Sequence, residues 1–355
     1  MKLWAELFEQ IIIYTDPKNE TPLGNNIALP SNCKIRKIFC QAGPGLGRNF
    51  LRLCQMPYVF IHLALVIRKS EFLLIRSPGI TALAANILNK FFDKPAIVKW
   101  ATQFQKMDLK ARALHLELSV LQKPPSNTRV LVYGETHNPR HISFYPALMK
   151  GSELQSMGKG FQTLKWEMPF QLLCVGRLFI FKDFDFVIKG LAFFSRKFPD
   201  LLWSLTIVGE GNERENLENQ IREYNLSDKI MLIGARSFDD LLEIYAQSHI
   251  SIIPGRYEGW CKVINESWAT QTIPLVVNEG NAPYILEFGE GAGLKYDHQE
   301  AAFARSLELA FQLNERQRIS IIEKGLRANE KMSLENFQKD ILEIIQVLNE
   351  NDVRG

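Results

Sequence analysis

The stretch QLLCVG, residues 171–176, opens the part of the chain that decides the fold. Four more short apolar blocks follow it: SLTIVG (204–209), KIMLIG (229–234), HISIIP (249–254) and IPLVV (273–277). Blocks of this kind are typical of strands buried on both faces of a parallel sheet. Amphipathic stretches that predict helices lie between them, near 184–197, 213–224, 238–247 and 260–271. The alternation predicts βαβ units in a doubly wound α/β domain.

The first half of the chain shows the same alternation with a weaker pattern. The expected strands are Glu9–Thr15, Lys34–Cys40, Glu71–Ile75, Ala96–Trp100 and Thr128–Tyr133, and the expected helices are 48–68, 80–92 and 106–121. The stretch 151–169 contains three glycines and little periodicity, so we expect a linker there. The resulting domains are an N-terminal Rossmann-like domain (1–160), a C-terminal one (161–332) and a C-terminal helix and tail (333–355).

The composition is that of a globular protein, with 355 residues of which 46% are hydrophobic and 23% charged. Residues 1–165 hold 22 Lys and Arg against 10 Asp and Glu, whereas the remainder holds 20 against 29. A basic half joined to an acidic half indicates different partners for each. An anionic membrane surface, an anionic acceptor or a nucleic acid would suit the basic half, but no nucleic-acid-binding motif is visible and we expect no such partner.

The cysteines and the apolar segments bear on the compartment. Five scattered cysteines without CxxC spacing favour a reducing compartment over a disulfide framework or a zinc site. The N-terminal residues lack the pattern of a signal peptide. The longest apolar run, Met56–Ile67, is shorter than the roughly 20 residues that span a bilayer. Basic residues flank it, so this helix is expected either to lie on anionic lipid or to pack in the core. The predicted location is the cytoplasm, with the inner face of the membrane as the alternative.

The segment PGRYEGWCKVINE, residues 254–266, carries the clearest site pattern. It follows an expected strand and is expected to open a helix near Gly259 or Trp260, where unpaired N–H groups and the positive dipole end suit a phosphate. If both were helical, Glu258 and Glu266 would lie about 12 Å apart along the axis, a span that suits an elongated ligand with hydroxyls near both ends. The alternative is that Glu258 caps the dipole and Glu266 faces water.

Two further clusters follow strands. VGRL (175–178), with Lys182 five residues after Arg177, places two cations at the carboxyl end of the first strand. There they could clamp a diphosphate leaving group, or simply form a solvated basic turn. IVGEGNER (207–214) is a glycine-rich strand-to-helix turn that is weak evidence alone.

In order and spacing, these clusters resemble the C-terminal domain of the retaining GT-B glycosyltransferases of family four, the glycosyl transferases group 1. That family shows VGRL with a later Lys, then IVGxGxxR, then a strand ending in Gly, and last PSxxEGxxxxxxEA, which here is PGRYEGWCKVINES (254–267). The resemblance covers roughly residues 170–295. It implies an α/β GT-B fold, in which two Rossmann-like doubly wound domains face a central cleft.

The resemblance also implies residue roles. Arg177 and Lys182 would hold the donor diphosphate and Glu258 would contact hydroxyls of the transferred sugar, so these three are the expected catalytic residues. Glu266 would accept hydrogen bonds from the ribose. The N–H groups that would meet the phosphate and sugar are those of Gly259, Trp260, Cys261 and Lys262. The other expected donor-site residues are Gly176, Gly209, Gly211 and Arg236, the last of them near the base.

The implied enzyme is a retaining glycosyltransferase that moves a hexose-type sugar to a saccharide or lipid-linked acceptor in surface polysaccharide synthesis. A UDP- or GDP-type sugar would be its co-substrate, without any further cofactor, and the leaving diphosphate would help to deprotonate the acceptor. Two alternatives stay open: a GT-B sugar-nucleotide epimerase, and a non-catalytic sugar-nucleotide-binding partner of another transferase. The second is favoured by the lack of a clear counterpart to the family's opening glycine-rich loop.

Other polar residues have simpler expected explanations. Asp183-Phe-Asp185 has the DxD spelling of metal-dependent transferases, but it opens an expected helix, so capping is favoured and no metal is expected. His137 and His141 could face the cleft, although histidines are more often structural. His249 lies in an expected buried strand and is predicted to be structural.

Overall fold

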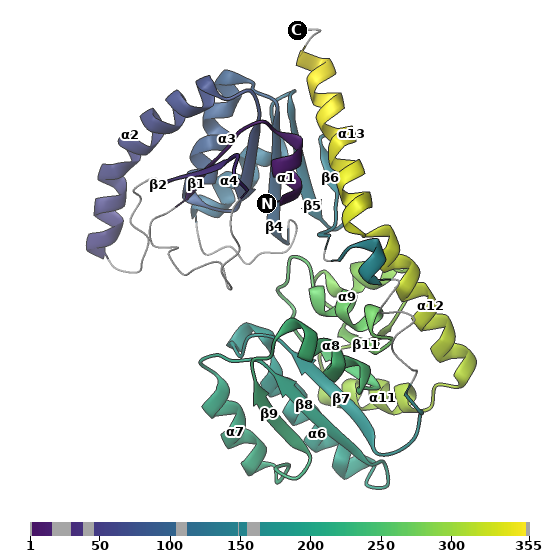
Figure 1. The fold of residues 1–355 in the computed structure, drawn as a ribbon. Coiled ribbons are helices and arrows are strands. Elements are labelled where there is room, and N and C mark those ends of the chain that lie inside the picture. Colours follow the sequence, from purple (N-terminus) through teal and green to yellow (C-terminus); the bar gives the residue numbers. More distant parts are fainter. Residues whose placement is uncertain are drawn as a thin grey trace.

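The computed structural model describes residues 2–15, 30–37, 46–103, 112–147, 149–154 and 164–352. Figure 1 shows two α/β halves, one above the other, with the long C-terminal helix running from the lower half along the upper one. Each half contains a parallel sheet, so the predicted class of two Rossmann-like units agrees with the structure.

The C-terminal half is built on a six-stranded parallel sheet of order β12-β11-β10-β7-β8-β9. Its strands are β7 (Phe170–Val175), β8 (Trp203–Val208), β9 (Ile230–Gly234), β10 (Ile250–Ile253), β11 (Ile273–Val277) and β12 (Leu294–Tyr296). With β7 as the first strand, this order is the dinucleotide-fold order, which reverses between β7 and β10. Ligands of such sheets bind outside the carboxyl ends of the strands at that reversal.

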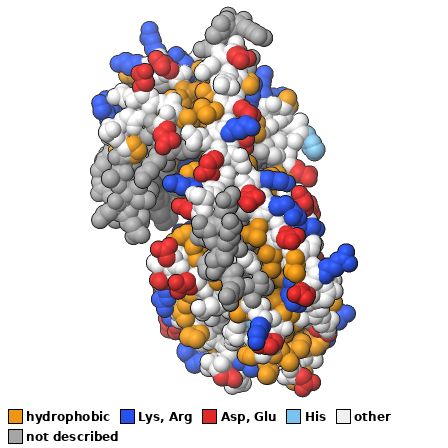
Figure 2. All heavy atoms as spheres, turned by 45° about the vertical axis from the view of Figure 1, so that its right-hand side comes forward, with side chains coloured by type: hydrophobic (Ala, Val, Ile, Leu, Met, Phe, Trp, Pro, Cys, Tyr) orange, Lys and Arg blue, Asp and Glu red, His pale blue; other side chains and the backbone are white. Residues whose placement is uncertain are grey.

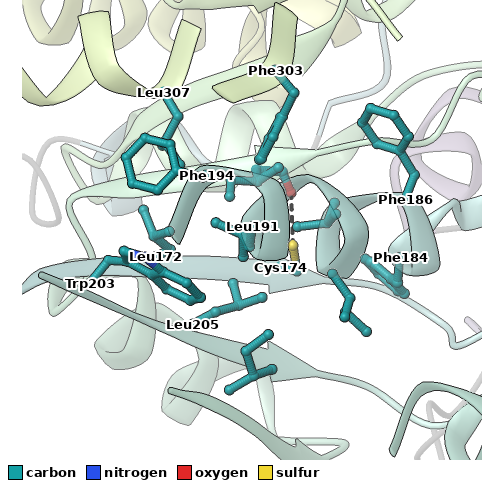
Figure 3. Packing of buried hydrophobic residues seen from close by; sticks show 14 of the residues in the cluster. Leu172, Cys174, Phe184, Phe186, Leu191, Phe194, Trp203, Leu205, Phe303 and Leu307 are labelled. Atoms are coloured by element: carbon teal, nitrogen blue, oxygen red, sulfur yellow. Dashed lines mark hydrogen bonds between the residues drawn. The ribbon is translucent and has the colours of Figure 1, made fainter. Parts of the chain in front are cut away.

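Helices cover both faces of this sheet, as the apolar strand blocks predict. The helical elements are η1 (Ile180–Lys182), α6 (Phe184–Lys197), α7 (Arg214–Glu223), α8 (Phe238–Ala246), α9 (Lys262–Ala269), α10 (Ala282–Phe288), α11 (Glu300–Phe311) and α12 (Glu315–Lys331). Figure 3 shows α6 and α11 packed over β7 and β8, with Leu191, Phe194 and Phe303 around the buried Cys174. The Cys174 thiol donates to the Ile252 carbonyl at 3.4 Å, and burial raises its pKa, so it is a packing residue.

The N-terminal half has a four-stranded parallel sheet of order β3-β4-β5-β6 and a separate parallel pair β1-β2. Its elements are α1 (Lys2–Leu7), β1 (Ile11–Thr15), β2 (Cys33–Lys37), α2 (Leu46–Lys69), β3 (Leu73–Ser77), α3 (Ile80–Phe92), β4 (Ala96–Gln103), α4 (Arg112–Gln122), β5 (Thr128–Tyr133) and β6 (His141–Ser143). One face of the larger sheet packs against α2, α3 and α4 through Val98, Trp100 and Val130. The opposite face carries Ile97, Leu131 and Tyr133.

The final helix, α13 (Leu334–Asp352), crosses back to the N-terminal half. Phe337 on α13 packs edge-on against Phe144, and Tyr145 donates a hydrogen bond to Asp340 at 2.7 Å. The same apolar cluster contains Trp260 and Ile264 from the other half. The segment predicted as a C-terminal helix and tail (333–355) contains this helix, which connects the two halves, while the domain boundaries at 160 and 332 stay predictions.

The sequence patterns located most elements closely but missed two short strands and three helices near the C-terminus. The predicted helices 80–92 and 184–197 match α3 and α6, and the expected strand Thr128–Tyr133 matches β5. The strands β6 and β12 were absent from the prediction because three residues give no periodicity. Helices α10, α11 and α12 were also missed. In the described residues, no helix is both long and apolar enough to cross a bilayer.

Candidate functional site

The loops after β7 and β8 form one side of the reversal point. Gly176 and Gly209 both have positive φ angles, at 156° and 148°. A Cβ on Gly209 would lie 1.8 Å from the Gly176 carbonyl oxygen, and one on Gly211 would lie 2.2 Å from that of Leu178. The glycines of IVGEG therefore allow the two loops to pack backbone against backbone. A role of Gly209 and Gly211 in touching a ligand stays a prediction.

The structure joins the two strongest sequence clusters through one ion pair. Lys182, in η1 after β7, donates to Glu258 Oε1 in the loop after β10. Both side chains are mostly covered, at 17% and 18% exposure. Glu258 folds back over Gly255, where a Cβ would lie only 2.8 Å from Oε1. Residues 76 positions apart in sequence thus meet at the edge of the sheet where a ligand is expected.

A second ion pair lies beside the first. Arg256 Nε donates to Asp183 Oδ2 at 2.7 Å, and its Nη1 lies 3.8 Å from Glu279. His298 Nε2 lies 3.6 Å from the same Asp183 oxygen, and its ring stacks on Phe186. Asp183 occupies the N-cap position of α6, but its side chain accepts no capping hydrogen bond. The capping explanation for Asp183 was therefore wrong, because Arg256 takes the carboxylate.

The second carboxylate of the DxD spelling also has a partner. Asp185 accepts a hydrogen bond from Lys189, one turn later on α6, at 3.1 Å. Both carboxylates of the DxD spelling thus form ion pairs with basic side chains, Asp183 with Arg256 and Asp185 with Lys189.

Helix α9 begins later than the sequence indicated. Lys262 is its first residue and Cys261 its N-cap, so the helix does not open at Gly259 or Trp260. Glu258 lies outside the helix, and the helical spacing of about 12 Å between the two glutamates does not apply. Cys261 has an extended backbone and makes no side-chain capping hydrogen bond, so no polar N-cap side chain marked the start of the helix.

Glu266 lies on α9 against a buried tyrosine. Tyr245 donates to Glu266 Oε2 at 2.9 Å, while the described residues provide no hydrogen bond to Oε1. Burial raises the pKa of Glu266; the hydrogen bond from Tyr245 and the charges of Lys262 and Lys182 oppose this shift. Because one carboxylate oxygen is held and the other is free, Glu266 is oriented to accept from a ligand.

The segment around Gly259 also contacts the N-terminal half. Asn281 donates to the carbonyls of Gly259 (2.7 Å) and Tyr133 (3.3 Å), so one side chain bridges the two halves. The Trp260 ring packs 5.6 Å from that of Tyr133, and its Nε1 donates to Asn265 at 2.8 Å. Only the backbone of Trp260 is left to meet a ligand.

The remaining predicted residues differ in their surroundings. Arg177 is exposed and lies over the Phe179 ring, and Arg236 is exposed beyond the end of β9. Burial raises the pKa of the Cys261 thiol, which does not suit it to nucleophilic chemistry.

The histidines have mainly structural contacts. His249 accepts from the Gln171 N–H and meets the Lys165 carbonyl, so it joins β10 to β7. His141 is buried, with Nε2 2.7 Å from the Leu121 carbonyl. His137 lies in the loop between β5 and β6.

Sequence reasoning missed Tyr245, Arg256 and His298. A Tyr in an amphipathic helix and an Arg within an assigned motif carry no signal for a distant partner. Only the strand order brings β7, α8 and β10 together, and spacing along the chain does not reveal that order.

Comparison with known proteins identifies the family. Residues 159–326 match the family model described as glycosyl transferases group 1. This half of the chain is a glycosyl transferases group 1 domain. The resemblance that the motifs indicated over about 170–295 is therefore confirmed.

Two curated relatives illustrate the match. An uncharacterised glycosyltransferase of Haemophilus influenzae is 34% identical over 137 residues, covering 37% of this chain and 34% of that protein. The lipopolysaccharide core biosynthesis glycosyltransferase LpsE of Rhizobium meliloti is 29% identical, covering 39% and 38%. The aligned part thus spans only about a third of such relatives.

Solved structures extend the likeness to both halves. HepE of Anabaena, in a complex with UDP and glucose, superposes with a TM-score of 0.64 at 16% identity, over 89% of this chain and 86% of that one. Sucrose-phosphate synthase of Thermosynechococcus elongatus gives 0.66 at 17% identity, over 98% and 91%. The GT-B fold predicted from the motifs is confirmed.

Proposed function

We propose that this protein is a retaining glycosyltransferase that moves a hexose-type sugar from a nucleoside diphosphate sugar to a saccharide or lipid-linked acceptor in surface polysaccharide synthesis. The observation that carries the proposal is the meeting of Lys182 and Glu258 at the strand-order reversal of a group 1 domain. A cation for a phosphate and a carboxylate for sugar hydroxyls lie side by side there. UDP is the favoured nucleotide, since HepE, which has the same fold, was solved with UDP and glucose.

The proposed chemistry needs positioning more than a protein nucleophile. Arg177 and Lys182 neutralise charge as it develops on the leaving diphosphate, where a preformed cation contributes most. The acceptor oxygen bonds to the anomeric carbon on the face that the diphosphate leaves, and a phosphate oxygen takes the acceptor proton. Glu258 holds the sugar, and Glu266 anchors the ribose through its free Oε1.

Calorimetric binding of UDP and GDP, and of their hexose conjugates, tests the donor site. Glu266→Ala should weaken binding of the preferred nucleotide roughly ten- to a hundredfold, since each charge-assisted hydrogen bond contributes about 1.5–3 kcal/mol. Unchanged affinity in the folded variant would remove the ribose assignment. Donor binding without nucleotide release in the presence of acceptors would instead identify a non-catalytic binding partner.

We also propose that α2 places the protein at the inner face of a membrane. Tyr58, Ile61 and Leu65 follow one another at helical spacing and are 56%, 64% and 55% exposed, and Arg68 and Lys69 follow in the last turn. On the face that Figure 2 turns forward, basic and acidic side chains are interspersed, so this face is not the one proposed to meet anionic lipid. The wild type should sediment with vesicles that contain anionic lipid, and the Ile61→Glu variant should no longer sediment with them.

A further inference from the structure

The N-terminal half carries two cations in an arrangement that no carboxylate among its described residues explains. Arg76 on β3 and Lys99 on β4 are register partners in adjacent parallel strands. Ile75 and Val98 face the helices α2 to α4, so the alternation of a strand turns Arg76 and Lys99 to the opposite face, beside Leu131 and Tyr133. Like charges directly opposite each other destabilise a sheet.

A third cation approaches from the other half. Lys262, the first residue of α9, lies close enough to affect Lys99: burial lowers the pKa of Lys99, and the charges of Arg76 and Lys262 lower it further. Lys99 Nζ lies 6.0 Å from the centre of the Tyr133 ring, which itself packs against Trp260. A lysine at the first turn of a helix also faces the positive end of its dipole, which is unfavourable without an anion.

The usual compensation is missing in the described part of the chain. Arg76, Lys99 and Lys262 form no salt bridge there, although the positive charge of Lys262 partly opposes the rise that burial causes in the pKa of Glu266. The buried Glu117 does not neutralise these cations. It accepts hydrogen bonds from the Gly79 N–H at 3.0 Å and from Asn86, and so fixes the loop that follows Arg76. Two cations on neighbouring strands, with a third within electrostatic reach on α9, thus carry positive charge that a bound anion would neutralise.

We propose that Arg76, Lys99 and Lys262 bind a phosphate group of the acceptor, so that the acceptor is a phosphorylated sugar or a lipid-linked sugar phosphate. This inference rests on the proposed transferase function. The donor diphosphate has its own proposed cations, Arg177 and Lys182, after β7, whereas Arg76 and Lys99 belong to the N-terminal half, where we expect the acceptor to bind. The clustering of positive charge in residues 1–165 favours the same partner.

The test measures binding of inorganic phosphate, glucose 6-phosphate and farnesyl phosphate to the full chain, with and without saturating UDP. Lys99→Gln and Arg76→Gln should each weaken binding of the phosphate probes roughly ten- to a hundredfold. Neither should change UDP affinity. Lys90→Gln, which removes an exposed cation on α3 away from this cluster, is the matched control and should bind like the wild type.

The outcomes separate this inference from the donor assignment. Preference for glucose 6-phosphate identifies a soluble acceptor, and preference for farnesyl phosphate identifies a lipid-linked one. The inference is overturned if the phosphate probes bind only by displacing UDP. It is also overturned if they bind the two variants as tightly as they bind the wild type. Absence of any phosphate binding while UDP binds overturns it as well. Failure of UDP to bind would instead count against the donor site. Thermal unfolding shows that each variant is folded, and Arg76→Gln changes an exposed side chain and so serves if Lys99→Gln does not fold.

Discussion

Replacing Glu258 with Gln should make UDP bind more tightly and a UDP-sugar react more slowly. In the structure Glu258 forms an ion pair with Lys182, the cation that we assign to the diphosphate. A diphosphate must therefore compete with this carboxylate, and it also meets its negative charge. Glutamine removes both obstacles, but it holds the sugar hydroxyls less strongly than a carboxylate does.

The size of the effect follows from the burial of the pair. Two unit charges in contact at an effective dielectric constant of about 20 attract by roughly 5 kcal/mol, most of which desolvation offsets. Exposed pairs retain about 0.2–1 kcal/mol. With only 17% and 18% of the side chains exposed, we expect a net coupling of about 1 kcal/mol, at or just above the upper end of that range. UDP should then bind about fivefold more tightly to the variant. The unfolding temperature of the variant should fall by roughly 2–4 °C, since the lost ion pair lies in a domain of ordinary size.

Calorimetry with UDP, and nucleotide release from a UDP-sugar, measure the two opposite effects. Glu279→Gln neutralises a neighbouring carboxylate that faces Arg256 instead, and it should leave UDP affinity within roughly twofold. Gly255→Ser offers an independent route, since a side chain there collides with the observed position of Glu258 and should displace it from Lys182. Weaker UDP binding by a folded Glu258→Gln variant would refute the competition.

Four further expectations concern residues of the same half. Burial raises the pKa of Glu266, so its ionised form costs stability above that pKa. Glu266→Gln should therefore raise the unfolding temperature at neutral pH, and the gain should vanish as the pH falls. Thermal melts at several pH values would show no such trend if the carboxylate were well solvated. Donor affinity of the wild type should also fall on acidification, beginning at a higher pH than an ordinary glutamate titrates, as calorimetry at several pH values can test. Arg177→Ala should reduce turnover more than donor affinity, because the charge develops in the transition state, and equal losses in steady-state kinetics would contradict this. Gly209→Ala should destabilise by more than about 3 kcal/mol in denaturant unfolding, because its Cβ would lie 1.8 Å from the Gly176 oxygen, and a near-neutral result would mean that the two loops pack differently.

The sequence predicted the C-terminal half well as far as β11 because its signals there are local. Apolar blocks such as 171–176 and 204–209 identify buried strands by themselves, and the motif order identifies the family. The start of α9 was misplaced because its N-cap, Cys261, has no capping side chain. The ion pair between Lys182 and Glu258 and the contact of Arg256 with Asp183 arise only when the strand order places β10 beside β7. The pairing of Arg76 with Lys99 is equally invisible, since it depends on the register of two strands.

The two groups of cations in this protein differ in whether a carboxylate of the described residues neutralises them. Lys182 is neutralised by Glu258, so a donor diphosphate gains a cation only by displacing a carboxylate that then becomes free to bind the sugar. Arg76, Lys99 and Lys262 have no such partner in the described residues, so an entering phosphate meets no competitor. We therefore expect the two affinities to respond differently to salt. Screening over about 8 Å at physiological ionic strength weakens the attraction of a phosphate to three open cations. For the donor, salt screens the competing Glu258 together with the diphosphate, and the two losses partly cancel. A phosphate-probe affinity that falls with added sodium chloride more steeply than UDP affinity would support this division, and equal slopes would contradict it.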